Sequence, residues 1–462
     1  MTEPDDAAQP RGPTTLADEK QLLARLRGSV KGLRQRIVLL GLGRLQLGLI
    51  GPTFADLGFE LAGVSLRDPA VARRVADHRY YRVITDPPYG GQDVEVVSAH
   101  HFDLSDPSST ESQAAIAAAA EARIINCGLG VSPQSLAAAS EFLLAVERYR
   151  RTSAIIDTLF ITSSDNPVGR TFAVDLVQSK LQAATFALEE DERVALWNDM
   201  AYHVKFLPTL ADRVCSTLQV PADPKRPASV IAEEFGELSF NRSLLGLQRL
   251  ASRDSERLGA IRLWDDLEVA RQRKLYTLSM AHAVTAYVGS FDSGPRTYVA
   301  DALQSSVVRS HVERALEDVT SALVAKSGGA ESEWFDYART VLRRIGDERL
   351  QDPLMRVARE VPRKLGRDDR LLGPLLLVLR TSFNLSVPLV AGVVYALVYA
   401  YVLASHDANE EPDPSSFSMA AELRAHGVRS VLRDVCALDL DDETESYVAD
   451  VIQREFQSLI PG

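Results

Sequence analysis

The sequence contains little cysteine and no excess of positive charge. Its 462 residues include 3 cysteines, 51 lysines and arginines, and 63 aspartates and glutamates, for a formal net charge of −12. Cys127, Cys215 and Cys436 are far apart, which argues against a disulfide framework or a cysteine metal site and favours a reducing, cytoplasmic location. Nucleic acids and anionic membranes bind basic surfaces, so the acidic balance argues against both as partners.

Long hydrophobic runs are also scarce. One stretch, "LSVPLVAGVVYALVYAYVLAS" at 385–405, is long enough to span a bilayer. Pro388 interrupts it and no basic residue flanks its C-terminal end, so we expect a buried helix of a large helical domain instead of a membrane span. Residues 1–35 are rich in Pro, Thr and Asp near the start and have no apolar core, and we expect a flexible N-terminal arm there.

Clusters of metal-ligating residues are missing too. Of the 8 histidines, His100 and His101 are adjacent, but they fall on an expected strand with no further ligand at metal-binding spacing. The sequence therefore predicts no metal site.

The pattern of the chain changes near residue 226. Short β-branched runs at 36–43 and 59–66 alternate with helical stretches such as 114–122, which predicts an α/β domain with a parallel sheet over 36–226. From 227 to 462, apolar residues recur every three to four positions, which predicts a predominantly α-helical domain.

A glycine turn follows the first expected strand, in "GLGRLQLGLIG" at 41–51. Gly41 and Gly43 stand where a backbone must approach a pyrophosphate closely at the start of a helix, so we expect a Rossmann-like dinucleotide-binding domain. Gln46 takes the place of the usual third glycine. We assign Gly41, Gly43 and Gln46 to the cofactor site.

The second expected strand ends in "GVSLRDP". Ser65 and Arg67 stand where an acidic residue would favour NAD, and a hydroxyl with an arginine suits the 2′-phosphate of NADP. The nearby acidic residue Asp68 leaves NAD possible as the cofactor, and Arg67 is also consistent with a solvated loop position. The cofactor is thus NAD or NADP, with NADP slightly favoured.

Three polar residues stand in an apolar helical run, "RQRKLYTLSMAHAVTAYVG" at 271–289. At about 100° per residue, Lys274, Ser279 and His282 fall at about 0°, 140° and 80° around a helix, in one wedge. This wedge is consistent with an active-site face, and equally with an ordinary helix whose lysine reaches solvent and whose histidine is satisfied internally.

Several segments together carry a family resemblance. Residues 274–289 resemble the K-L-x-x-x-N-x-x-H-A-x-x-A-Y-x-G signature of the polyol-specific long-chain dehydrogenases, which include mannitol and mannitol-1-phosphate dehydrogenases. The turn at 41–51 is similar to the family's G-x-G-N-x-G-R-G turn. "SSDN" at 163–166 and "LADRV" at 210–214 resemble its asparagine-containing strand end and V-D-R-I segment. Residues 352–374 resemble its late R-V-x-R-D-P run, and the segments occur in the family's order.

The resemblance implies a role for each polar residue. Lys274 matches the general base that takes the hydroxyl proton while hydride leaves for the nicotinamide. A lysine amine can do this where burial or a nearby cation lowers its pKa from about 10.4. His282 matches the family histidine that binds a substrate hydroxyl. Asn166 matches the asparagine whose amide stabilises the reacting oxygen, and Asp212 matches an aspartate that interacts with the lysine and relays protons.

Four positions depart from the family pattern, among them Leu47 in place of an arginine of the phosphate turn and Leu238 in place of a tryptophan at the start of the second domain. Ser279 replaces a second asparagine beside the reacting oxygen, and Gln46 replaces a glycine of the phosphate turn. These replacements indicate either a changed substrate or a chain without turnover.

Basic residues gather in "RVAREVPRKLGRDDR", where Arg359, Arg363 and Lys364 are candidates for binding a substrate phosphate or carboxylate. A solvated face, with acidic residues of the same segment as partners, would give the same pattern.

The predicted function is an NAD(P)-dependent oxidoreductase that interconverts a secondary alcohol of a polyol or sugar phosphate and its carbonyl form. The predicted partner is therefore a small polyol or sugar phosphate. Two alternatives stay open: an epimerase or isomerase that retains its nicotinamide, and a non-catalytic nucleotide-binding homologue.

Overall fold

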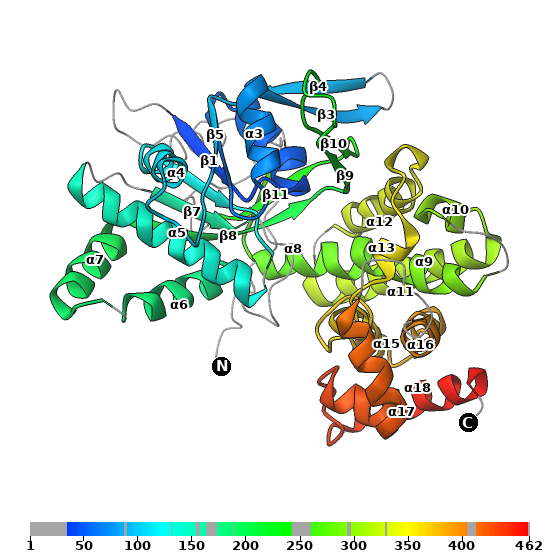
Figure 1. The fold of residues 1–462 in the computed structure, drawn as a ribbon. Coiled ribbons are helices and arrows are strands. Elements are labelled where there is room, and N and C mark those ends of the chain that lie inside the picture. The colour runs from blue at the N-terminus through cyan, green and yellow to red at the C-terminus, as the bar shows by residue number, and fades with distance from the viewer. Residues whose placement is uncertain are drawn as a thin grey trace, which may run out of the picture. The chain divides into compact units, whose positions relative to one another are not determined.

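The computed structural model of the protein describes residues 35–86, 90–130, 132–153, 158–162, 173–186, 188–242, 260–292, 297–328, 330–403 and 413–460. The chain forms two compact units, one ending at Ala270 and the other beginning at Arg271 (Figure 1). The expected N-terminal arm lies outside the described residues, apart from Gln35.

The first unit contains a large sheet with the parallel core expected from the sequence. At one end of this core, β11 pairs antiparallel with β8, and β12 pairs parallel with β11. In sheet order, the strands found in the described residues are β12 (Ile261–Trp264), β11 (Glu237–Asn241), β8 (Val204–Asp212), β7 (Thr158–Thr162), β6 (Ile124–Cys127), β1 (Arg36–Leu40), β2 (Glu60–Ser65) and β5 (Ser98–His101).

Both faces of this sheet are buried. Successive side chains of a strand point to opposite faces, so the residues of one strand contribute to two hydrophobic cores. On β1, Ile37 and Leu39 join one hydrophobic core and Val38 and Leu40 join the other. The core around Val38 is formed with helices α4 to α7, and the core around Ile37 with η1, α2, α3 and the small sheet. The helices of this unit are η1 (Gln46–Ile50), α2 (Gly51–Asp56), α3 (Pro69–His78), α4 (Thr110–Ala120), α5 (Pro133–Thr152), α6 (Ala173–Thr185) and α7 (Glu190–His203).

A second, four-stranded sheet has the order β4 (Gly90–Glu95), β3 (Tyr80–Asp86), β10 (Ser229–Ala232), β9 (Cys215–Gln219). Strands β10, β11 and β12 lie after residue 226, in the stretch expected to be helical. They are four or five residues long, too short for helical or strand periodicity to be distinguished in the sequence. The helical part of the chain therefore begins later than the expected boundary.

The second unit is helical in its described residues (Figure 1). Helix α9 lies at its centre, where Ala283, Val284, Ala286 and Tyr287 are fully buried. In chain order the helices are the end of α8 (Leu267–Lys274), η2 (Leu275–Ser279), α9 (Met280–Phe291), α10 (Val299–Leu303), α11 (Ser306–Ser327), α12 (Glu331–Ile345), η3 (Glu348–Leu350), α13 (Leu354–Ala358), α14 (Val361–Lys364), α15 (Leu372–Ser382), α16 (Val387–Leu403), α17 (Pro414–Asp434) and α18 (Glu443–Leu459).

Helix α16 accounts for the longest apolar run of the sequence. It packs against α9, α17 and α18, and Leu389, Val393 and Leu397 are fully buried. Among the described residues, no helix combines the length and the apolar character that crossing a bilayer requires.

Candidate active site

The glycine turn at the end of β1 leaves room for a phosphate beside the backbone. Gly41 has a φ of 82°, and a Cβ there would lie 2.6 Å from Leu129 Cδ2, so this position requires glycine. A Cβ on Gly43 would meet only Gly41 O, at 3.9 Å. The turn thus combines a glycine of positive φ with an open backbone at the start of a helix, which fits the pyrophosphate of a nicotinamide dinucleotide.

Gln46 faces inward from this turn. Its side chain is fully buried, and Nε2 donates to Leu40 O at 3.2 Å and to Asn126 O at 2.7 Å. The amide therefore connects the ends of β1 and β6, and fills space that a third glycine would leave empty.

The end of β2 presents a hydroxyl and a guanidinium. Ser65 Oγ donates to Asp68 O at 2.7 Å, and the Asp68 carboxylate caps α3 by accepting from Ala70 N at 2.8 Å. Arg67 is exposed and donates to Ser135 Oγ in the first turn of α5. The arrangement places no carboxylate directly at the end of the strand, where an acid would bind the ribose hydroxyls of NAD.

Asp212 is the last residue of β8 and is 3% exposed. It lies opposite Glu237 of β11, which is fully buried. The neighbouring Arg213 donates to Gly48 O at 2.6 Å and to Glu233 O at 2.7 Å, and so connects the end of β8 to the glycine-turn helix. Burial lowers the pKa of Arg213. Asn166 lies outside the described residues.

In the second unit, a π-turn changes the geometry expected for the lysine helix. Met280 N donates to Leu275 O, five residues earlier, so η2 takes up one extra residue between Lys274 and His282. That residue uses about 100° of rotation, which moves His282 from about 80° to within about 20° of Lys274. The two side chains therefore lie almost in line along the helix.

Partial exposure also distinguishes the three polar residues of this helix. From residue 270 to residue 289, Lys274, Ser279 and His282 are the positions that keep partial exposure, and every other residue is buried. An amine, a hydroxyl and an imidazole are thus the partly exposed groups of an otherwise buried helix.

His282 is an uncharged imidazole at neutral pH. Its side chain is 14% exposed, and burial lowers its pKa to about 4, against the opposing effect of Asp352. His282 Nε2 lies 3.8 Å from Asp352 Oδ2, too far for a hydrogen bond, while Asp352 Oδ1 accepts from Arg356 Nε at 2.7 Å. No sequence signal reveals this approach, because 70 positions (352 − 282) separate the two residues.

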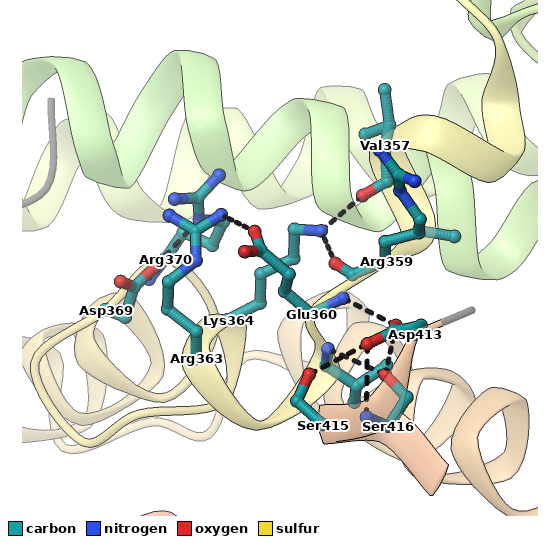
Figure 2. Close-up of polar contacts among 12 residues, drawn as sticks. Val357, Arg359, Glu360, Arg363, Lys364, Asp369, Arg370, Asp413, Ser415 and Ser416 are labelled. Atoms are coloured by element: carbon teal, nitrogen blue, oxygen red, sulfur yellow. Dashed lines mark hydrogen bonds and ion pairs between the residues drawn. The ribbon is translucent and has the colours of Figure 1, made fainter. Parts of the chain in front are cut away.

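The basic segment of α13 and α14 is held by contacts within the unit (Figure 2). Arg363 donates to Glu360 Oε2 at 2.6 Å, and Lys364 Nζ donates to Val357 O at 2.6 Å and to Arg359 O. Burial, with Arg370 and Arg363 as neighbours, lowers the pKa of Lys364 well below its usual range. Lys364 therefore anchors the turn between the two helices.

Helix α17 fixes this turn from below in Figure 2. Glu360 has a φ of 59°, an uncommon conformation for a residue with a side chain. Its N–H donates to Asp413 Oδ2 at 2.8 Å, and Val361 N donates to Ser416 Oγ at 3.1 Å. The N-terminal cap of α17 thereby holds the segment that carries Arg359 and Arg363.

Comparisons with known proteins agree with this division into two parts. Residues 35–248 match the family model of the mannitol dehydrogenase Rossmann domain, and residues 266–459 match that of the mannitol dehydrogenase C-terminal domain.

Curated proteins similar to the chain include two mannitol-1-phosphate 5-dehydrogenases. That of Caldanaerobacter subterraneus subsp. tengcongensis is 25% identical, over 91% of this chain and 97% of its own length. That of Bacillus velezensis is 28% identical, over 88% of this chain and 97% of its own length.

Two solved structures share the fold. One is Pseudomonas fluorescens mannitol 2-dehydrogenase in a ternary complex with NAD and D-mannitol, with a TM-score of 0.69 and 17% identity over 94% of both chains. The other is a D-sorbitol dehydrogenase without substrate, with a TM-score of 0.67 and 15% identity over 94% of both chains. The expected Rossmann-like domain followed by a helical region is confirmed.

Proposed function

Because the chain belongs to the mannitol dehydrogenase family, we propose that it interconverts a secondary alcohol of a polyol or sugar phosphate and its carbonyl form, with Lys274 as the general base. The family performs nicotinamide-dependent polyol oxidoreduction. The observation that carries the proposal is the partial exposure of Lys274, Ser279 and His282 on an otherwise buried helix, where a π-turn brings Lys274 and His282 almost into line. A bound nicotinamide would supply the hydride acceptor.

Each residue of this helix has a distinct task in the proposal. The Lys274 amine removes the hydroxyl proton during oxidation and returns it during reduction. Ser279 donates one hydrogen bond to the reacting oxygen, and the uncharged His282 binds a neighbouring substrate hydroxyl. Asn166 and Asp212 complete the set by family resemblance, as a ligand of the reacting oxygen and a partner in proton relay.

A sugar-alcohol phosphate is the substrate we favour. The curated relatives that cover most of the chain are named mannitol-1-phosphate 5-dehydrogenases. Arg359 and Arg363 lie on a turn that Lys364 and the cap of α17 hold in place, and a guanidinium matches the geometry of a phosphate. In this proposal Lys364 contributes by fixing the turn that presents the two arginines.

Ser65 and Arg67 favour NADP over NAD. Asp68 is committed to capping α3, and Ser65 holds the loop through its hydrogen bond to Asp68 O, which leaves the exposed Arg67 guanidinium to meet the ribose substituent. Replacing Arg67 by alanine should raise the KM for NADP about tenfold, the effect of losing about 1.4 kcal/mol of binding, and change the KM for NAD less than twofold. Equal changes in the two KM values would contradict the preference.

The test of the function is an assay of the purified chain with matched substrates. Mannitol 1-phosphate and mannitol, sorbitol 6-phosphate and sorbitol are offered with NAD or NADP, and reduced nicotinamide is followed by absorbance. We expect turnover, and a higher kcat/KM for the phosphate of each pair. Cofactor binding without turnover on any polyol would overturn the proposal and favour a non-catalytic homologue.

A further inference from the structure

We propose that Gln46 is a positioning residue of the dinucleotide site, where its side-chain amide holds the glycine turn against the end of β6. The inference rests on the nicotinamide binding of the proposed function. The inference assigns a structural role to Gln46, which replaces the third glycine of the usual dinucleotide-binding turn.

Gln46 lies at the point of the sheet where the strand order reverses. The chain runs from β1 to its neighbour β2 on one side, and later to β6 on the other side. Dinucleotides bind outside the carboxyl ends of such a pair of strands. Nε2 of Gln46 has acceptors on both of these strand ends, namely Leu40 O, Asn126 O and, at 2.9 Å, Asn126 Oδ1.

Gly128, directly after β6, is shaped to fit this side chain. A Cβ at Gly128 would lie 2.3 Å from Gln46 Cγ and 2.6 Å from Nε2, so only glycine leaves room for Gln46. Gly128 N also donates to Leu40 O at 2.9 Å. The small residue that the turn lacks at position 46 is present instead at Gly128, directly after the neighbouring strand β6.

The contact reaches the first glycine of the turn through the next residue. Leu129 Cδ2 lies so near Gly41 that a Cβ there would approach it to 2.6 Å. Gly128, which adjoins Gln46, directly precedes Leu129, and Leu129 packs on Gly41, the first residue of the glycine turn. A shift at Gln46 or Gly128 would be passed to the phosphate-binding backbone.

The buried amide is not explained by packing alone. Gln46 Oε1 is buried without a hydrogen-bond partner among the described residues, which costs desolvation that an apolar side chain would not incur. A methionine of similar shape would fill the same space. The amide is therefore needed for its two-strand hydrogen bonds, which set the position of the turn.

Four variants test this, and one of them is the single variant Gln46→Ala that serves as the reference for the double variant. Gln46→Met keeps the volume and removes the donor, Gly128→Ala inserts a methyl group against Gln46, and Gln46→Ala/Gly128→Ala makes room for that methyl group. The dissociation constant is measured by fluorescence titration for NADH, which has the same pyrophosphate as NADPH and no 2′-phosphate, and the thermal unfolding midpoint is measured for each protein. We expect Gln46→Met to bind NADH about tenfold more weakly. Its midpoint should fall less than that of Gly128→Ala, because the volume is kept and buried hydrogen bonds alone are lost.

The double variant supplies the matched control. We expect Gly128→Ala to weaken NADH binding more in the wild-type background than in the Gln46→Ala background, since the two residues contact each other. Gln46→Met binding NADH as tightly as wild type, or equal effects of Gly128→Ala in both backgrounds, would overturn this inference alone. A wild-type chain that binds neither NADH nor NADPH would overturn the proposed function as well.

Discussion

The protonation of His282 gives a prediction whose size follows from the structure. Burial lowers its pKa from 6.5 to about 4, which corresponds to about 3 kcal/mol in favour of the uncharged form. The unfolded chain binds the proton at higher pH than the folded chain, so stability is lost as pH falls from about 6.5 towards 4 and is unaffected above that range. Between about pH 7 and about pH 5 this amounts to about 2 kcal/mol.

Urea unfolding at these two pH values measures the effect. His282→Gln cannot be protonated, so it should lose about 2 kcal/mol less stability than the wild type on going from the higher to the lower pH. His426→Gln is the matched control, because His426 lies on α17 of the same unit with a 61% exposed side chain. If His282→Gln and wild type lose the same stability, the burial argument for an uncharged His282 is refuted.

Two further predictions concern the packing of the helical unit. Gly289→Ala would bring a methyl group to 2.7 Å from Ala302 Cβ and should lower the free energy of unfolding by about 2 kcal/mol, with recovery in Gly289→Ala/Ala302→Gly; no recovery would contradict the contact. Glu445 is fully buried and accepts hydrogen bonds from Arg367 and Arg380. Burial opposes its ionisation, but these bonds lower the pKa of Glu445, so Glu445→Gln should cost about 2 kcal/mol at neutral pH. That difference should shrink as pH falls below the unfolded pKa, and a constant difference in urea unfolding would contradict it.

Much of the fold can be predicted from the sequence because its signals are local. The alternation of β-branched runs and helices predicts the parallel sheet, and the glycines after "RIVLL" predict the turn at the end of β1. Strands β10 to β12 are not predicted, since four or five residues are too few to show a period. Their place is decided by distant partners, as when β10 pairs with β3.

The candidate site is predicted in residue types more than in geometry. A helix of 3.6 residues per turn puts Lys274 and His282 about 80° apart, and no local pattern reveals the π-turn that brings them almost into line. Charge alone cannot show that Lys364 faces two backbone carbonyls. The approach of Asp352 to His282 depends on how α13 packs on α9.

The central claim is that the Lys274 amine moves the substrate proton, and the most direct measurement is oxidation by Lys274→Ala with and without an added small amine. Removing a general base should lower kcat by about 10²–10⁴-fold. The dissociation constant of the cofactor should stay unchanged. We predict that methylamine partly restores turnover, and more so as pH rises, because its neutral form replaces the missing group. Undiminished turnover in Lys274→Ala would contradict the account. So would a loss of turnover that no added amine restores, at amine concentrations that leave the turnover of the wild type unchanged.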